Sequence, residues 1–406
     1  MPNIEEKQAQ LEKEIEENLD ISIINLIEYL IEKAIKNKVS DIHIDPNSDT
    51  VKVRFRIDGV LQKPFFLPKK THEEIISRIK VLCKLRTDEH QTAQDGRFRY
   101  SIVEPDNFVD IRVSMVPTYY GENVVMRLLS TDNQKVTLKQ LGFSDSDQEK
   151  IIRCLKKPHG MVLATGPTGS GKTTTLYSLI NLLNSPDVSI VTIEDPIEYA
   201  IDDVEQIQVN TKNGLGFANG LRSILRQDPN IIMVGEIRDK ETAGIAVNTA
   251  LTGHLLLSTI HTNDAIGTIP RLIDMGVEEY LISSTLSLVI GQRLVRKICT
   301  YCKSTYKPND IDKKFIKSHR TEDVINLYRG EGCKRCGMSG YSGRISINEI
   351  LIIDDKIREA IHDKKSLNEL KKIALGNNTK TLLMDGLEKV MNGVTTIDEI
   401  LRVTNE

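Results

Sequence analysis

The chain has 406 residues, of which 39% are apolar and 27% charged, an ordinary composition for a globular protein. A formal net charge of −3 leaves no overall basic footprint for nucleic acid, so no nucleic-acid partner is expected. No stretch approaches the roughly eighteen apolar residues of a membrane span, and residues 1–20 lack the cationic and apolar regions of a signal peptide. We therefore expect a cytosolic protein of about two or three domains without a membrane span.

The first 130 residues divide into an arm and a small domain. Residues 1–20 are rich in Glu and Lys, which predicts an acidic, solvated N-terminal arm. Apolar residues from 21 to 35 recur at helical spacing and predict an amphipathic helix. Alternating apolar and polar residues then indicate strands, with Asp58-Gly59 as a hairpin signal and a helix expected over 73–84. Residues 21–130 are thus predicted to form a small α+β domain.

The centre of the chain has the pattern of an α/β fold. A polar stretch at 131–139 is interpreted as a linker. Over 140–292 apolar strands alternate with helical stretches, which is typical of a doubly wound parallel sheet. The candidate strands are residues 161–164, 189–193, 206–209, 231–234 and 255–259.

Residues 166–173, Gly-Pro-Thr-Gly-Ser-Gly-Lys-Thr, match the phosphate-loop pattern G-x-x-x-x-G-K-[ST]. They lie between the strand at 161–164 and a predicted helix at 174–183, which is the setting that the motif needs. Its glycines would let successive backbone N–H groups face the phosphates of ATP, beside the helix N-terminus. The alternative is a glycine-rich turn with a surface lysine. The expected nucleotide-binding residues are Gly166, Pro167, Thr168, Gly169, Ser170, Gly171, Lys172, Thr173 and Thr174.

Hydrolysis also needs groups that place Mg²⁺ and a water molecule. Lys172 would reach the β and γ phosphates, and the Thr173 hydroxyl would hold Mg²⁺. Glu236 ends an apolar strand and is the second magnesium candidate, although Gly235 occupies the place of the usual Asp. Glu194 ends another strand and would orient or deprotonate the attacking water. Either carboxylate alone could instead be a helix cap or a surface charge.

Two histidines flank the apolar strand at 255–259. His254 and His261 are both candidates for a position near the γ phosphate, where an imidazole can hydrogen-bond to a phosphate oxygen. The alternative for each is a histidine that only satisfies local hydrogen bonds. We hold both interpretations open.

Four of the six cysteines form two C-x-x-C pairs. They are Cys299, Cys302, Cys333 and Cys336. In a cytosolic chain such pairs favour a structural zinc site with four thiolate ligands over disulfides, although redox-active or unpaired thiols remain the alternative. We expect a zinc-binding element over 293–345 and a helical region over 346–406.

Several segments in one order resemble the secretion ATPases that power type II secretion and type IV pilus assembly. They are residues 40–44, 94–97, 121–127, 166–173, 192–199, 225–239 and 252–265. The resemblance covers the chain from about residue 21 onward. It implies a RecA-like phosphate-loop core and a PAS-like small domain that caps the nucleotide.

The same resemblance implies a hexamer. Arg112 and Arg127 of the small domain, and Arg222 and Arg226 of the core, would then approach the phosphates. In other NTPases such an arginine raises the rate by roughly 10³ to 10⁵. Assembly and secretion ATPases of this kind usually carry the four cysteines, whereas retraction ATPases usually lack them.

We therefore expect a Mg²⁺-dependent ATPase, a hexameric motor for pilus or pseudopilus assembly in a type II secretion, type IV pilus or DNA-uptake system. It would act in the cytoplasm, at the inner face of the membrane, through a platform protein there. By comparison with the family's long members, we expect the chain to lack their first N-terminal domain, which leaves its docking open. The alternatives are a retraction or DNA-translocating ATPase, and a nucleotide-sensing scaffold with little turnover.

Overall fold

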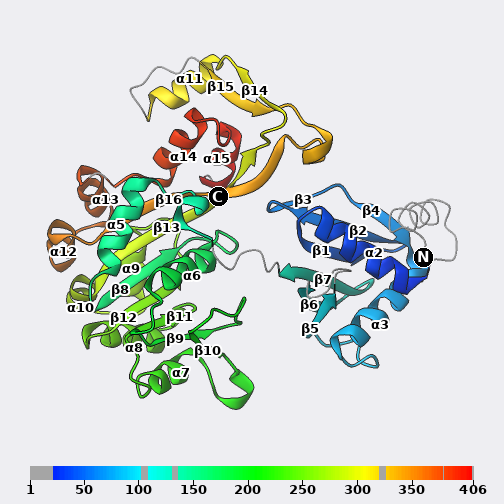
Figure 1. Cartoon of the computed structure of the whole chain (residues 1–406), viewed down its shortest axis with the longest axis horizontal. Coiled ribbons are helices and arrows are strands. Elements are labelled where there is room, and N and C mark those ends of the chain that lie inside the picture. The colour runs from blue at the N-terminus through cyan, green and yellow to red at the C-terminus, as the bar shows by residue number, and fades with distance from the viewer. Residues whose placement is uncertain (1–21, 102–107, 130–135, 320–325, 378, 405–406) are drawn as a thin grey trace. The chain divides into compact units, whose positions relative to one another are not determined.

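A computed structural model describes residues 22–101, 108–129, 136–319, 326–377 and 379–404. The chain divides into two compact units, Met1–Asp132 and Asn133–Glu406, each with its own core (Figure 1). The predicted arm at 1–20 and most of the predicted linker lie outside the described residues.

The N-terminal unit is an antiparallel sheet with two helices. Its elements are α2 (Ile23–Lys36), β1 (Val39–Pro46), β2 (Thr50–Ile57), β3 (Val60–Leu61), β4 (Phe65–Pro68), the 3₁₀ turn η1 (Lys69–Thr71), α3 (His72–Cys83), β5 (Gln94–Ser101), β6 (Phe108–Thr118) and β7 (Gly121–Leu129). The strand order is β3-β2-β1-β7-β6-β5, with β4 also paired to β2. The predicted helices are present as α2 and α3.

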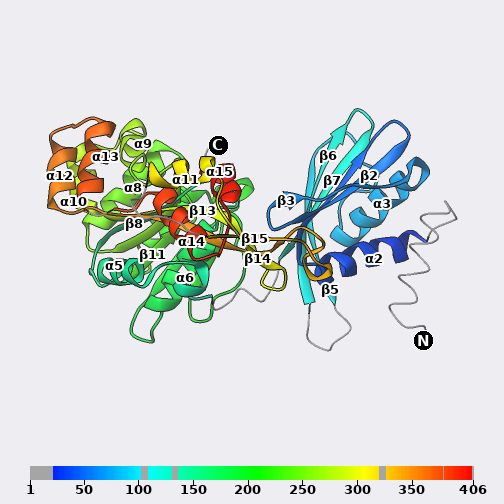
Figure 2. The same ribbon diagram turned by 90° about the horizontal axis from the view of Figure 1, so that it is seen from above.

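One face of this sheet is apolar because the strands alternate. Val51 and Val53 are fully buried, whereas Lys52 and Arg54 between and after them point to the polar face. Both α2 and α3 cover the apolar face (Figure 2). The predicted hairpin joins β2 to β3, and both Asp58 and Gly59 have the positive φ angles of a type I′ turn.

The C-terminal unit is built on a seven-stranded sheet of order β10-β9-β11-β12-β8-β13-β16. Its strands are β8 (Gly160–Thr165), β9 (Ile190–Glu194), β10 (Glu205–Gln208), β11 (Ile231–Val234), β12 (Leu255–Ile260), β13 (Leu286–Ile298) and β16 (Tyr341–Ile352). The first six pair in parallel, and β16 pairs antiparallel to β13. All five predicted strands are present, with ends displaced by one residue at most.

Two strands of this sheet were not predicted from the sequence. β13 joins the sheet beside β8, and β16 extends it beyond β13. The predicted domain boundaries at 292 and 345 fall inside these two strands. The cysteine segment is therefore an excursion between two long strands of the main sheet.

Helices cover both faces of the sheet, as in a doubly wound fold. One face packs against α4 (Leu138–Leu141), α5 (Asp145–Leu155) and α6 (Lys172–Leu183). The other packs against α7 (Phe217–Ile224), α8 (Lys240–Leu251), α9 (Thr268–Asp274), α10 (Glu279–Thr285), α12 (Asp355–His362) and α13 (Leu367–Gly376). Strands covered on both faces read as continuous apolar runs, which is why the sequence indicated them so clearly.

The cysteine segment adds a small subdomain. It contains the two-stranded sheet of β14 (Lys303–Tyr306) and β15 (Leu327–Gly330), the helix α11 (Asp310–Lys317) and the 3₁₀ turn η4 (Lys334–Cys336). Ile316 and Leu327 are buried in a separate cluster with residues of α14 (Leu382–Met391) and α15 (Ile397–Thr404).

Candidate nucleotide site and metal cluster

The phosphate loop leaves the carboxyl end of β8 and enters α6, as the motif requires. Gly166, Gly169 and Gly171 have φ angles of 148°, 78° and 91°, which L side chains rarely adopt. A Cβ on Gly166 would lie 2.4 Å from the carbonyl oxygen of Gln292, so this position also has no room for a side chain. The three glycines therefore shape the loop in the way that the sequence predicted.

Lys172 lies at the start of α6 with its side chain folded back onto the loop. Its Nζ donates to the carbonyl oxygens of Gly166, at 2.9 Å, and Pro167, at 3.0 Å. Burial lowers the pKa of Lys172 to about 8, although the negative charge of Glu236 opposes that shift. A bound triphosphate would supply the negative charge that this buried ammonium group lacks.

Glu236 follows β11 and lies beside the loop. It is 9% exposed, and its Oε2 lies 2.5 Å from Nε of Arg238 and 3.6 Å from Nε2 of His261. Burial and the charge of Lys172 both lower the pKa of His261. The structure thus brings Lys172, Glu236 and His261 together at the carboxyl end of the sheet.

Glu194 occupies the predicted strand end, but buried side chains hold its carboxylate. β9 adjoins β11, and the Gly235 N–H donates to the carbonyl of Ile193 at 2.8 Å. Glu194 is 2% exposed and accepts hydrogen bonds from the Tyr177 hydroxyl and from Thr192, at 2.6 Å. Gln206 Nε2 donates to it as well, at 3.1 Å. To orient a water molecule, Glu194 would have to give up one of these contacts.

The structure separates the two histidines. His261 follows the carboxyl end of β12, whereas His254 precedes its amino end, where its Nδ1 lies 3.2 Å from the carbonyl of Thr249. A six-residue strand spans about 20 Å. The expectation that His254 lies near the phosphates is therefore corrected. β8 and β12 are parallel, so the phosphate loop follows their carboxyl ends, whereas His254 lies at their amino ends.

Contacts within their own units hold three of the four predicted arginines, Arg127, Arg222 and Arg226. Arg222 pairs with Glu241 at 2.7 Å, and Arg226 donates to the Arg222 carbonyl, both on the exposed surface of α7 and the residues after it. In the N-terminal unit, Nε of Arg127 lies 2.8 Å from Oδ1 of Asp41. Arg112 is the register partner of Arg127 across β6 and β7. Their approach to a phosphate stays a prediction.

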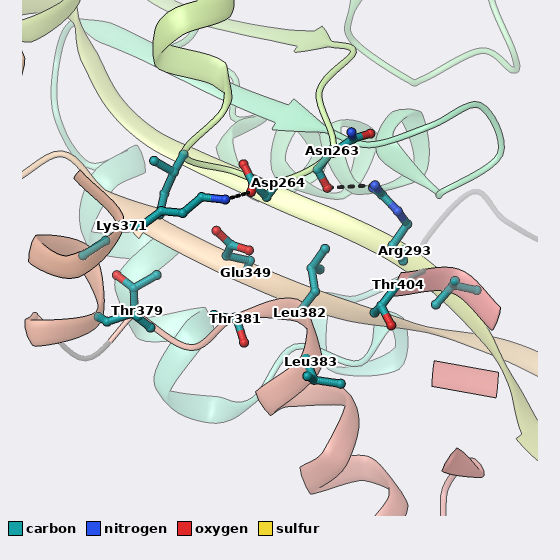
Figure 3. Close-up of a pocket in the computed structure, with 14 residues that line it drawn as sticks. Asn263, Asp264, Arg293, Glu349, Lys371, Thr379, Thr381, Leu382, Leu383 and Thr404 are labelled. Atoms are coloured by element: carbon teal, nitrogen blue, oxygen red, sulfur yellow. Dashed lines mark hydrogen bonds and ion pairs between the residues drawn. The ribbon is translucent and has the colours of Figure 1, made fainter. Parts of the chain in front are cut away.

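Sequence reasoning missed the contribution of β13 to the loop. Arg293 is buried, and its Nη2 donates to the Asn263 carbonyl at 2.7 Å (Figure 3). Its Nη1 would lie 3.1 Å from a Cβ on Gly166, which places the guanidinium group beside the phosphate loop. Gln292 accepts a hydrogen bond from Thr175 on α6 at 2.9 Å. No local pattern marks these residues, because β13 meets the loop only through the order of the strands.

Two buried polar atoms near the loop have no hydrogen-bond partner among the described residues. They are Oγ of Ser170 and Nε2 of Gln292. Buried polar atoms are nearly always satisfied in native proteins, so these two atoms favour a polar ligand at the loop.

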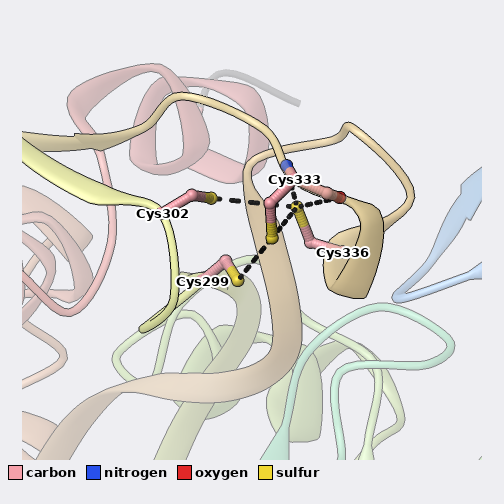
Figure 4. Close-up of side chains that lie close together, drawn as sticks. All are labelled: Cys299, Cys302, Cys333 and Cys336. Atoms are coloured by element: carbon pink, nitrogen blue, oxygen red, sulfur yellow. Dashed lines mark hydrogen bonds between the residues drawn. The ribbon is translucent and has the colours of Figure 1, made fainter.

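The four cysteines converge (Figure 4). Their sulfur atoms all lie within 4.8 Å of one another, with Sγ to Sγ distances of 3.9 Å for Cys299 and Cys333, 3.8 Å for Cys302 and Cys336, and 3.7 Å for Cys333 and Cys336. Sulfur atoms about 2.3 Å from a tetrahedral zinc are about 3.8 Å apart, so the set fits that metal. The backbone N–H groups of Cys333 and Gly340 also point at the Cys336 sulfur.

Comparison with known proteins shows the family of the chain. The profile of the "Type II/IV secretion system protein" family matches residues 16–402. The chain belongs to this family. The type II secretion system ATPase E of Vibrio cholerae serotype O1 is 45% identical over 404 residues, which is 100% of this chain and 80% of the relative. The type IV pilus assembly ATPase PilB of Thermus thermophilus is 46% identical, over 98% of this chain and 45% of the relative.

Solved structures of related ATPases have the same fold. The ATPase DotB of Legionella pneumophila superposes with a TM-score of 0.69 at 22% identity, covering 94% of this chain and 95% of the other. The pilus retraction motor PilT, solved with bound ADP, gives 0.63 at 26% identity, covering 93% and 96%.

These findings confirm the family resemblance, the RecA-like phosphate-loop fold and the prediction of an ATPase of the secretion family. Among the described residues, no helix combines the length and the apolar character needed to cross a bilayer.

Proposed function

We propose that this secretion-family ATPase is the subunit of a hexameric motor that powers the assembly of a pilus or pseudopilus. The observation that carries the proposal is the grouping of Lys172, Glu236 and His261 at a phosphate loop, in a chain 45% identical throughout to a type II secretion ATPase. The four-cysteine cluster supports an assembly or secretion role over retraction.

The residues at the loop divide the work of hydrolysis. The backbone amides of the loop and Lys172 would bind the β and γ phosphates. Thr173 and Glu236 would hold Mg²⁺, which neutralises charge on the transferring phosphoryl group. Glu194 would accept a proton from the attacking water once it leaves Tyr177 or Gln206. His261, next to Glu236, would contact the γ phosphate.

The remaining predictions complete the proposal. Arg112 and Arg127, with Arg222 and Arg226, would stabilise charge on the transferring phosphoryl group. The four cysteines would hold a structural zinc ion. The motor would work in the cytoplasm, at the inner face of the inner membrane, by engaging a platform protein there.

The test is steady-state phosphate release by Glu236→Gln. We expect turnover to fall roughly 10²-fold or more, because the amide keeps the shape of the side chain but loses the charge that would help to hold Mg²⁺. Nucleotide binding should persist, since the loop and Lys172 are intact. Glu205→Gln is the matched control, as an exposed glutamate on β10, and should keep wild-type turnover. Equal, near-background rates in wild type and Glu236→Gln would contradict the proposal and favour a nucleotide-sensing scaffold.

A further inference from the structure

The loop His261–Ala265 is anchored to the nucleotide site at its first two residues. His261 lies beside Glu236, as described above. Thr262 N–H donates to Oγ1 of Thr165 at 2.9 Å, and the two threonine hydroxyls are 2.6 Å apart. Thr165 is the last residue of β8 before the phosphate loop. A shift of this loop would therefore move His261 relative to the phosphates.

Two cations hold the rest of the loop His261–Ala265. Arg293 on β13 donates to the Asn263 carbonyl at 2.7 Å. Nζ of Lys371, on α13, lies 2.8 Å from Oδ2 of Asp264 (Figure 3). The other oxygen of Asp264 accepts the Gly267 N–H at 2.7 Å, which ties the loop to the start of α9.

A pocket lies against this part of the loop. Its volume is about 350 Å³, and Asn263, Asp264, Glu349 and Lys371 are among its lining residues (Figure 3). Side chains that line an open pocket lack close-packed neighbours on that side. Ala265, at the end of the loop, is fully buried in the core of the C-terminal unit. The discrete polar contacts of Asn263 and Asp264 therefore set the position of the loop between Thr262 and that packed end.

We propose that Lys371 is a positioning residue for ATP hydrolysis, which holds the loop through Asp264 so that His261 stays beside Glu236. This inference rests on the function proposed above. It also links the C-terminal helices to the nucleotide site through Asp264, although α13 contributes no residue to the phosphate loop.

The exposure of the ion pair makes the proposal testable. The side chains of Lys371 and Asp264 are 41% and 28% exposed, and exposed pairs add little to stability. Removal of Lys371 should therefore leave the fold and its melting temperature nearly unchanged. Its effect should appear in kcat, because the phosphate loop and Lys172 bind ATP without help from this helix.

The experiment compares Lys371→Ala, Lys371→Arg and Lys372→Ala in the full chain. We expect Lys371→Ala to lose about tenfold in kcat at unchanged KM for ATP. Arginine can reach the same carboxylate and should restore most of the rate. Lys372 is the exposed neighbour on α13, and its removal should change nothing.

Three outcomes would overturn this role. They are equal kcat in Lys371→Ala and Lys372→Ala, no rescue by arginine, and a melting temperature in Lys371→Ala that falls by many degrees. His261→Ala separates this failure from that of the proposed function. If His261→Ala is slow and Lys371→Ala is not, only the positioning role fails. Wild-type turnover in both variants would overturn the positioning role together with the assignment of His261.

Discussion

Burial shifts the pKa of Lys172 and of Glu349 toward neutrality, and both side chains lie in the C-terminal unit. Lys172 is the phosphate-loop lysine, and burial brings its pKa to about 8. Glu349 is 3% exposed on β16, and burial raises its pKa to about 7, helped by the charge of Asp264. Backbone N–H groups of Leu382 and Ala265, and the charge of Lys371, only partly oppose that shift. A triphosphate would supply the negative charge that compensates the buried lysine.

Glu349 should make the fold less stable as the pH rises. Its pKa is about 7 in the folded chain and about 4.5 when unfolded, so the folded state keeps the proton longer between these values. The free energy of unfolding should then fall by about 2.5 kcal/mol from pH 5 to pH 8. Glu349→Gln should lack this component, as urea denaturation at the two pH values would show.

The control for that measurement is Glu241→Gln, an exposed glutamate on α8. It should keep the wild-type dependence on pH. The same loss of stability in wild type and in Glu349→Gln would show that another group titrates.

At the scale of elements, we expect the cysteine subdomain to need a bound metal ion for its stability. Its sheet has only two short strands, and its apolar residues Ile316 and Leu327 belong to a small cluster shared with α14 and α15. So small a core stabilises little by burial alone, and natural domains of this size usually add a metal or disulfides. The four converging sulfur atoms would supply that support by binding the proposed zinc ion.

Zinc analysis tests this element. We expect about one equivalent of zinc per chain, because the four thiolates fill a tetrahedral site. Cys302→Ser and Cys336→Ser should not retain the metal, and a strong chelator should remove it from the wild-type protein. In each case the subdomain should become sensitive to proteolysis. Cys154→Ala is the control, since Cys154 lies in the core of the main sheet and outside the cluster. Less than half an equivalent of zinc, with no change on chelation, would contradict the site.

At the scale of the whole molecule, two of the four predicted arginines belong to a different unit from the phosphate loop. Arg112 and Arg127 lie on neighbouring strands of the N-terminal unit, and the loop belongs to the other unit. In a hexamer, the arginines of one subunit could serve the nucleotide of the next.

Mixing two defective variants tests that arrangement. Arg127→Ala and Lys172→Ala should each lower turnover by roughly 10³-fold or more. If the arginine acts across subunits, mixed oligomers contain intact sites, and turnover should rise at least about tenfold above either variant alone. Lys172→Ala mixed with Glu236→Gln is the control, because both defects lie in one core and no intact site can form. Wild-type turnover in Arg127→Ala, or no recovery on mixing, would contradict the proposal.

Much of the fold was predictable because its signals are local. The loop at 166–173 and the five predicted strands depend on spacing and on apolar runs within a few residues. β13 and β16 were not predicted, because their pairing joins segments on either side of the cysteine subdomain. The prediction for His254 failed for a related reason. Two histidines that flank one strand look equivalent in sequence, but the direction of the strand places only His261 at the carboxyl end, where the phosphate loop lies.

The amino-acid sequence alone determined the features that depend on residues close together in the chain. These are a loop that can bind phosphate, strands that end in acidic residues, and cysteines spaced for a metal. Which of these groups meet was settled by the folded chain. Glu236 and His261 reach Lys172, while Glu194 turns to Tyr177 and Gln206. The reason is that strand order and strand direction are set by contacts between distant segments, and no local pattern records them.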